Sequence, residues 1–401
     1  MLLYWHIVDF LTDRRILSSM IQRILQNVIQ ANLHKGKAVI LYGARQCGKT
    51  TVTRMTVDAS SEKAVWLSGD DDEDVRIFST VTKSVWPQIL GPYKLLIIDE
   101  AQRIPDIGRA VKILIDFFPD VQVILTGSSS FRIANITEEP LTGRKYEYRL
   151  YPFSFLELCG AASLPDERKA LQQRLLFGSY PEVVTKPDEA QSLLQLIADS
   201  YLYRDLFEYE GIRRPKLLRD LLRLLAYQIG NEVSTAELAS ALSVSRGTVD
   251  SYISLLEQSF IIFTLNAYST NKRNELKKAK KIYFCDNGIR NAVLGDFTPI
   301  GARKDTGALW ENYLVSERIK YLSNKNASPA NGTSIASPYF WRTTDGMEID
   351  YIEECAGSLS AYEFKWNPDK KCRVTAAFTN RYPDAGVTVV TPDMYQNFLG
   401  L

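Results

Sequence analysis

The stretch AVILYGARQCGKTT, residues 38–51, is the part of this 401-residue chain that most clearly indicates its fold. Its first five residues form an apolar run typical of a buried strand, and the next eight match GxxxxGKT at the start of a predicted helix. In this pattern glycines let backbone N–H groups face a phosphate, the lysine reaches the outer phosphates, and the threonine hydroxyl joins magnesium. The sequence thus predicts a loop that binds ATP with Mg²⁺, made of Gly43, Ala44, Arg45, Gln46, Cys47, Gly48, Lys49, Thr50 and Thr51.

Three further apolar runs predict the rest of a sheet around this loop. They are AVWLS at 64–68, LLIID at 95–99 and VQVILTG at 121–127, with helical stretches such as IGRAVKILIDFF between them. Strands that alternate with helices indicate an α/β fold with a parallel, doubly wound sheet. After residue 150 the predicted elements become mainly helical.

Polar residues at the ends of two of these strands predict the remaining catalytic groups. Asp99 is placed to hold magnesium through water, and Glu100 to orient and deprotonate the attacking water. In P-loop proteins with one strand between the loop strand and the Asp-Glu strand, a hydroxyl at the end of the intervening strand touches the γ-phosphate or the attacking water. We choose Ser128 over Thr126 for this role. The alternative is that this segment is only a turn rich in small residues. Arg144 is a candidate for stabilising charge at the transferred phosphate, or an ordinary surface arginine.

Composition restricts the classes of protein to consider. Lys and Arg number 48 against 47 Asp and Glu, so the net charge is +1 and any basic site must be local. Five scattered cysteines form no disulfide framework or paired metal pattern, and His6 and His34 lie far from other candidate ligands. No segment has about 18 uninterrupted apolar residues, so we expect no membrane span and a cytoplasmic location.

The order of several short motifs resembles the prokaryotic AAA ATPases related to the archaeal and STAND groups. The motifs are GARQCGKTT, LLIIDEAQRIPDI, VILTGSSS, LTGR, YPFSFLEL, GSYPEVV and YLYRDL. The resemblance covers nearly the whole chain from Met20, and it implies an AAA core, a winged helix and a C-terminal domain with nuclease-like features. It also implies a GxP element that senses nucleotide, with Gly178 and Pro181 near the adenosine, and it is compatible with a homo-oligomer.

These observations predict five segments. They are an N-terminal extension at 1–19, an AAA-type P-loop core at 20–150, a helical lid at 151–214, a winged helix with a basic wing at 215–300, and a nuclease-like domain at 301–401. Residues 1–19 depart from the family pattern. The stretch at 323–337 is small and polar, so we expect an exposed loop there.

Residues 234–262 have helix-turn-helix spacing. Ser234 and Glu237 form an S-x-x-E capping box, and Ser245 caps the second helix. A hairpin wing is expected to follow, with a cluster of cations that would bind DNA phosphates: Lys272, Arg273, Lys277, Lys278, Lys280 and Lys281. Alternatively the unit packs internally as a lid or dimer surface; Arg246 in the second helix favours DNA and Asp250 opposes it. Asp286, at the exit of this unit, is expected to be structural.

Four residues near the C-terminus resemble the site of PD-(D/E)xK nucleases. Glu311 lies in a predicted helix, Asp350 ends a predicted strand, and Glu363 and Lys365 lie two apart on the next strand, facing one side. The resemblance implies carboxylates that converge on magnesium while the lysine polarises a water or phosphate. Paired surface charge gives the same pattern, and a fold persists after its chemistry is lost.

Two functions are compatible with these patterns. One is an ATPase that couples ATP hydrolysis to action on DNA through the winged helix and the nuclease-like domain. The other is a nucleotide-gated, STAND-like switch that acts through protein interactions and carries an inactive nuclease-like domain. The basic wing and the D…ExK pattern favour the first function, whereas the near-neutral net charge and the lack of a second strong DNA-binding motif leave room for the second.

Overall fold

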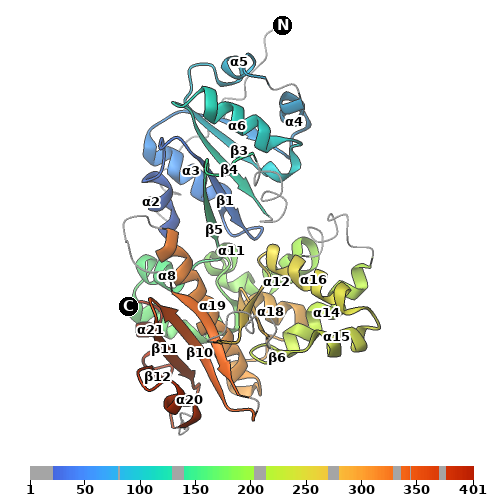
Figure 1. Cartoon of the computed structure of the whole chain (residues 1–401), viewed down its shortest axis with the longest axis vertical. Helices are drawn as coiled ribbons and strands as arrows, with labels where there is room; N and C mark the ends of the chain where they lie inside the picture. The colour runs from blue at the N-terminus through green and yellow to red at the C-terminus, as the bar shows by residue number, and fades with distance from the viewer. Residues whose placement is uncertain are drawn as a thin grey trace.

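The computed structural model describes residues 21–79, 82–128, 140–202, 214–269, 280–327, 336–343, 345–369 and 376–401. In Figure 1 a parallel sheet lies at the top, helices α14 to α16 lie to the right, and a second sheet lies below, with the long helix α19 between the sheets. None of the helices in these ranges is both long and apolar enough to cross a bilayer.

The first sheet has five parallel strands in the order β2-β3-β4-β1-β5. Its strands are β1 (Ala38–Gly43), β2 (Ala64–Ser68), β3 (Leu95–Asp99), β4 (Gln122–Gly127) and β5 (Lys145–Leu150). The predicted α/β class with a parallel central sheet is confirmed, and β2 and β3 have the predicted bounds. β4 lies between β1 and β3, so one strand separates the phosphate loop from the Asp-Glu pair.

β1 is buried along its whole length because helices cover both faces of this sheet. Alternate β1 residues point to opposite sides: Val39 packs with α2 (Ile24–Gln30) and α3 (Lys49–Ser60), and Ile40 packs with α6 (Ile107–Phe117). Smaller helices complete this domain, namely α4 (Asp72–Ser79), α5 (Trp86–Leu90) and η1 (Ala101–Arg103).

A run of helices follows β5, as the sequence predicts. The helices are α8 (Phe155–Ala161), α9 (Leu164–Lys169), α10 (Leu171–Phe177), α11 (Pro181–Thr185), η2 (Pro187–Glu189), α12 (Ala190–Leu196) and η3 (Ile197–Leu202). The first begins with a complete capping box, in which Ser154 and Glu157 satisfy each other's backbone N–H groups.

The next unit combines three helices with a small antiparallel sheet in the order β6-β8-β7. Its elements are α14 (Pro215–Tyr227), β6 (Glu232–Val233), α15 (Thr235–Leu242), α16 (Arg246–Gln258), β7 (Ile262–Asn266) and β8 (Lys280–Phe284). Ser234 caps α15 by accepting from the N–H of Glu237, and Ser245 caps α16 by accepting from the N–H of Thr248.

Two of the six cations expected in the wing fall on β8. Lys280 is exposed, but the side chain of Lys281 is 1% exposed and forms ion pairs, so its predicted place on a solvent-facing wing is wrong. Strand alternation explains the difference, because neighbouring residues of a strand face opposite sides. The other four, Lys272, Arg273, Lys277 and Lys278, lie outside the described residues.

The C-terminal part places one long helix against a mixed four-stranded sheet in the order β12-β11-β10-β9. Its elements are α18 (Asn287–Leu294), η4 (Ile300–Ala302), α19 (Thr306–Ala327), β9 (Ser337–Arg342), β10 (Glu348–Cys355), β11 (Ser358–Phe364), α20 (Ala376–Arg381), β12 (Gly386–Val390) and α21 (Tyr395–Phe398). Asp350 lies near the start of β10 and not at the end of a strand. In the expected loop at 323–337, residues 323–327 continue α19, and 328–335 lie outside the described residues.

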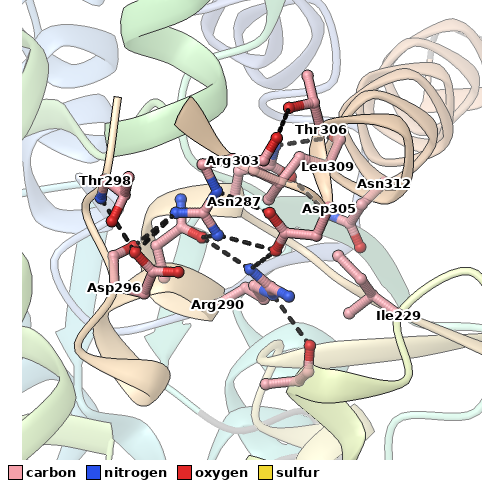
Figure 2. A network of polar contacts seen from close by, with 12 residues as sticks. Ile229, Asn287, Arg290, Asp296, Thr298, Arg303, Asp305, Thr306, Leu309 and Asn312 are labelled. Carbon is pink, nitrogen blue, oxygen red and sulfur yellow. Dashed lines mark hydrogen bonds and ion pairs between the residues drawn. The ribbon is translucent and has the colours of Figure 1, made fainter. Parts of the chain in front are cut away.

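A polar network joins the three-helix unit to the C-terminal part (Figure 2). Arg290 donates to the carbonyl of Ala226 at the end of α14 and pairs with Asp305, whose carboxylate Arg303 also binds. Asp286 caps α18 by accepting from the backbone N–H groups of residues 288 and 289, so its expected structural role is confirmed. Arg290 thus links the end of α14 to Asp305, the residue before α19.

Candidate functional site

The loop at residues 43–50 connects the carboxyl end of β1 to the first turn of α3. Its shape depends on two glycines. A Cβ at Gly43 would lie 2.3 Å from the carbonyl oxygen of Leu150, and Gly48 has φ +93°, in the left-handed region that favours glycine. The loop therefore curls tightly before the N-terminus of α3, an arrangement suited to binding phosphate.

The predicted lysine, threonine and aspartate meet at this loop. Lys49 Nζ is buried and donates to the carbonyls of Gly43 at 2.9 Å and Ala44 at 3.0 Å. Thr50 Oγ1 donates to Asp99 Oδ2 at 2.8 Å, which brings together the hydroxyl and carboxylate oxygens that Mg²⁺ prefers beside phosphates. These residues fit the metal that the pattern implies.

Thr126 and Ser128, the two hydroxyls considered at the end of β4, make different contacts. Thr126 is fully buried and donates to the second oxygen of Asp99. Ser128 accepts from Gln102 Nε2 at 3.1 Å, and the same amide group donates to Glu100. Ser128 is thus linked to Glu100, and Thr126 orients Asp99. The sequence analysis did not single out Gln102, although its position two residues after Glu100 in the motif LLIIDEAQ could have indicated it.

An open cleft of about 470 Å³ lies beside these groups. It is lined by Arg45, Gln46, Asp70, Glu100 and Arg103. The cleft contains both a P-loop cation and the predicted catalytic carboxylate, so a phosphate chain on the loop would extend toward Glu100.

Arg144 lies at the other end of the sheet. Its carbonyl accepts from the N–H of Ala38, the first residue of β1, whereas the phosphate loop follows the last residue of that strand. The separation along the strand is roughly 16 Å. Arg144 Nε instead pairs with Asp116 at 2.7 Å. The prediction that Arg144 stabilises charge at the phosphate loop of its own chain is therefore wrong. Arg144 directly precedes β5 and lies at the amino ends of the strands, whereas the phosphate loop lies at their carboxyl ends.

Arg23 is a buried residue that the sequence did not single out. It donates to the carbonyl of Cys47 at 2.8 Å and to the carbonyl of Tyr151 at 2.6 Å, and it pairs with Glu157 at 3.0 Å. A Cβ added at Gly48 would lie 3.7 Å from its guanidinium. Arg23 thus supports the phosphate loop from behind, and no local pattern marks it because its partners are distant in sequence.

The GSYP motif at 178–181 lies between the loop and the rest of the chain. Pro181 is 4.0 Å from where a Gly48 Cβ would be, so it contacts the phosphate loop. Gly178 instead packs against the carboxylate of Asp286, which also accepts from the N–H of Ser179 at 2.8 Å. The two residues of the expected nucleotide-sensing element therefore face different partners, one at the P-loop and one at α18.

Buried charges extend this contact to α19. Lys320 Nζ donates to Ser179 Oγ at 2.9 Å and to Glu317 at 2.7 Å, and Glu317 accepts from the N–H of Phe155 at 2.7 Å. Burial raises the pKa of Glu317 and of Asp286, and Lys320 opposes both shifts. These contacts connect the GSYP motif mechanically to α18 and α19.

Six charged side chains gather where β8, α19, β10 and β11 meet, and we call them the C-terminal ion cluster. It holds two lysines and four carboxylates: Lys281, Glu311, Glu348, Asp350, Glu363 and Lys365. The four predicted residues of the nuclease-like site are thus brought together. Lys365 Nζ lies 2.8 Å from Glu363 and 3.7 Å from Asp350.

Lys281 and Glu348 are members of this cluster that the sequence did not assign to it. Lys281 Nζ lies 3.0 Å from Glu311 and 2.5 Å from Glu348. Burial raises the pKa of Glu311 to about 7; Lys281 opposes this shift, and Asp350 adds to it. Burial also disfavours the charge on Lys281, but the carboxylates of Glu311 and Glu348 outweigh it and raise the lysine's pKa.

Within the described ranges, no three His, Cys, Asp or Glu side chains are arranged to hold a metal ion. As arranged here, the carboxylates of the C-terminal ion cluster therefore do not fit the divalent cation that the nuclease resemblance implies. Their positive partners are the two lysines.

Comparisons with known proteins divide the chain into three matched segments. A family described as AAA domain matches residues 35–159, and two domains of unknown function, DUF8612 and DUF4143, match 168–299 and 306–398.

The chain also resembles known relatives and solved structures at low sequence identity. The uncharacterized protein Rv2008c of Mycobacterium tuberculosis is 27% identical over 340 residues, covering 83% of this chain and 71% of that protein. An uncharacterized protein of Haemophilus influenzae is 24% identical over 278 residues, which are 64% of this chain and 69% of that protein. The Walker-type ATPase PABY2304 of Pyrococcus abyssi overlaps 69% of this chain and 97% of its own, with 15% identity and a TM-score of 0.49.

The AAA match coincides with the sheet that carries the phosphate loop, Lys49, Asp99 and Glu100. The chain thus carries a P-loop ATPase domain of the AAA kind at residues 35–159 and a DUF4143 domain at residues 306–398.

Proposed function

We propose that this protein hydrolyses ATP at the phosphate loop and couples the reaction to action on DNA. The observation that carries the hydrolytic part is the convergence of Thr50, Asp99 and Thr126 beside Lys49, with Glu100 on the adjoining cleft. Lys49 would bind the outer phosphates, and Thr50 and Asp99 would hold Mg²⁺, which when bound would supply positive charge at the transferred phosphate.

Glu100 is the proposed base for the attacking water. Gln102 orients it through an amide that also binds Ser128, so the carboxylate and the hydroxyl are held as one unit. Gly43 to Thr51 form the nucleotide cradle, and Pro181 senses the nucleotide from the far side of Gly48. A shift of Pro181 would pass through Ser179 to Asp286 and Lys320.

The lysine prediction tests this assignment. At 4 Å and an effective dielectric constant near 20, one cation contributes about 4 kcal/mol to binding a unit negative charge. Lys49→Ala should therefore weaken ATP binding by roughly 1000-fold, measured by titration with a fluorescent ATP analogue. Affinity equal to that of the parent protein would refute the assignment of the loop.

The DNA-binding part rests on the three-helix unit, which we propose is a winged helix. Its first helix, α14, buries leucines on one side and exposes Lys216, Arg219 and Arg223 at helical spacing on the other. Tyr227 follows on the same face with 64% of its surface exposed. Cations at one-turn spacing beside an exposed ring suit a nucleic acid backbone. The expected α16 surface is less basic, because Arg246 is accompanied by Asp250.

Salt dependence of DNA binding tests this surface. Replacing Lys216, Arg219 and Arg223 with alanine should reduce the slope of log affinity against log salt by about 0.9 for each phosphate that is no longer neutralised. Arg109 and Lys112 on α6 are exposed cations of the ATPase domain, so their double alanine variant is the matched control. Equal slopes in the two variants would assign the basic face of α14 to solvent.

The C-terminal ion cluster is the proposed site of action on DNA, and it favours a second candidate function as well. Incubation with plasmid, Mg²⁺ and ATP, followed for phosphate release and for DNA breaks, separates the two candidates. Breaks that Asp350→Ala removes while phosphate release survives would support action on DNA at this cluster. The alternative is a nucleotide-gated switch with an inactive nuclease-like domain. The pairing of Lys281 with Glu311 and Glu348 favours it. Phosphate release with no breaks in any DNA substrate would support the switch.

A further inference from the structure

We infer that Lys281 is a built-in cation that closes the Glu311–Glu348 side of the C-terminal ion cluster to divalent metal. The inference deepens the second candidate function, the switch with an inactive nuclease-like domain, and rests on it. It concerns a contact between two parts of the chain, because β8 belongs to the three-helix unit and both carboxylates belong to the C-terminal part.

Geometry puts the ammonium group where a metal ion would have to bind. Lys281 Nζ is within 3.0 Å of carboxylate oxygens from Glu311 and Glu348, which come from a helix and a strand. The lysine side chain is 1% exposed, so it has no alternative position in solvent without movement of β8. A divalent ion bound by the same two carboxylates would be repelled by this charge at close range.

Neighbouring groups keep Lys281 in this position. Its ammonium lies 5.4 Å from the centre of the Phe340 ring, a cation–π contact with β9. Tyr283, two residues along β8 and on the same face, donates to Glu311 Oε1 at 2.7 Å. A Cβ at Gly230 would lie 3.2 Å from the Glu311 carboxylate, so the loop after α14 covers that carboxylate from another side.

The other side of the cluster has its own cation. Lys365 lies near Glu363 and Asp350, and Asp350 also accepts from the N–H of Phe364 at 2.8 Å. Lys365 is 25% exposed, whereas Lys281 is 1% exposed. The half of the cluster held by Lys281 is thus the one that opens only if β8 separates from β10 and α19.

Counting bound Mn²⁺ tests the inference. The full chain without nucleotide would be titrated with Mn²⁺ and followed by calorimetry, in the parent protein, Lys281→Met and Lys280→Met. Lys280 is the matched control because it is the preceding residue of the same strand and is exposed. Lys281→Met should bind one more Mn²⁺ per chain than either of the others, and adding Glu311→Gln should abolish the gain.

An unchanged Mn²⁺ count in Lys281→Met that still binds ATP like the parent would overturn the inference. If Lys281→Met does not fold, the number of Mn²⁺ ions bound by the single variant Glu311→Gln is compared with the number bound by the parent protein. The two numbers should be equal. A lower number in Glu311→Gln would overturn the inference, because it would mean that Glu311 already holds metal beside Lys281. The test measures bound Mn²⁺ and not DNA cleavage. If Lys281→Met binds the additional Mn²⁺ but cuts no DNA, that result would count against the proposed nuclease activity and would leave the inferred role of Lys281 unchanged.

Discussion

Gly178→Ala should destabilise the protein far more than an ordinary glycine replacement. Gly178 has φ +66°, where an alanine costs about 1–2 kcal/mol. Its added Cβ would also lie 1.9 Å from Asp286 Oδ1, although ordinary contacts exceed 3.4 Å. Asp286 would have to leave its 2.8 Å bonds to the N–H groups of Ser179 and Gly288, each worth about 1.5–3 kcal/mol. The total cost is therefore about 4–8 kcal/mol.

Gly295→Ala is the matched control for this measurement. Gly295 has the same φ of +66°, but no atom lies within 4 Å of the position of its added Cβ. Urea unfolding of the two variants, followed by far-UV circular dichroism, should thus give a free energy of unfolding that is about 3–6 kcal/mol lower for Gly178→Ala than for Gly295→Ala. Equal unfolding midpoints would refute the close packing of Gly178 on Asp286. Asp286→Ala should remove most of the added cost when combined with Gly178→Ala.

Three further changes test two residues of the ATPase domain and one residue of the polar network around Arg290. Glu100→Gln should keep ATP affinity and slow phosphate release by at least 100-fold, because shape survives while the base is lost; unchanged turnover would exclude Glu100 as the base. Arg144→Ala should leave single-chain turnover within twofold of the parent, since Arg144 pairs with Asp116 away from the loop, and a tenfold loss would contradict this. Burial disfavours the charge of Asp305, but its bonds to Arg303 and the charge of Arg290 lower its pKa to about 2. Its stabilising contribution is present above about pH 4 and lost toward pH 2, so Asp305→Asn should flatten the pH dependence of the unfolding midpoint in that window. A midpoint that falls as steeply as in the parent would contradict this role.

The GSYP motif gives the nucleotide site a route to the rest of the chain. Pro181 contacts the phosphate loop, and Ser179, two residues earlier, is bonded to Asp286 of α18 and Lys320 of α19. These bonds are buried, so a displacement of the motif cannot be absorbed by solvent-exposed side chains. Both candidate functions need such a route, because each one links ATP to a distant surface.

Short stretches of the sequence were enough to predict the parallel sheet, the phosphate loop and the two acids at the carboxyl end of β3. These features are local: an apolar run predicts a buried strand, GxxxxGKT predicts a turn before a helix, and parallel strands bring their carboxyl ends to one edge. Thr50 and Asp99 meet at 2.8 Å because the motif and the strand end lie at that edge. The class of the domain follows from these stretches alone.

The roles of Arg23, Arg144 and Lys281 depend instead on how distant parts of the chain pack. Arg144 stands in a motif, yet the register of β5 on β1 carries it to the opposite edge of the sheet from the phosphate loop. Arg23 reaches the loop through partners 24 to 134 residues away in the sequence. Lys281 lies in the C-terminal ion cluster and not on the expected basic wing, and its partners Glu311 and Glu348 are 30 and 67 residues away. The physical reason is common to all three. A long cation can bond in any direction within reach, so its partner depends on which distant elements the fold packs beside it.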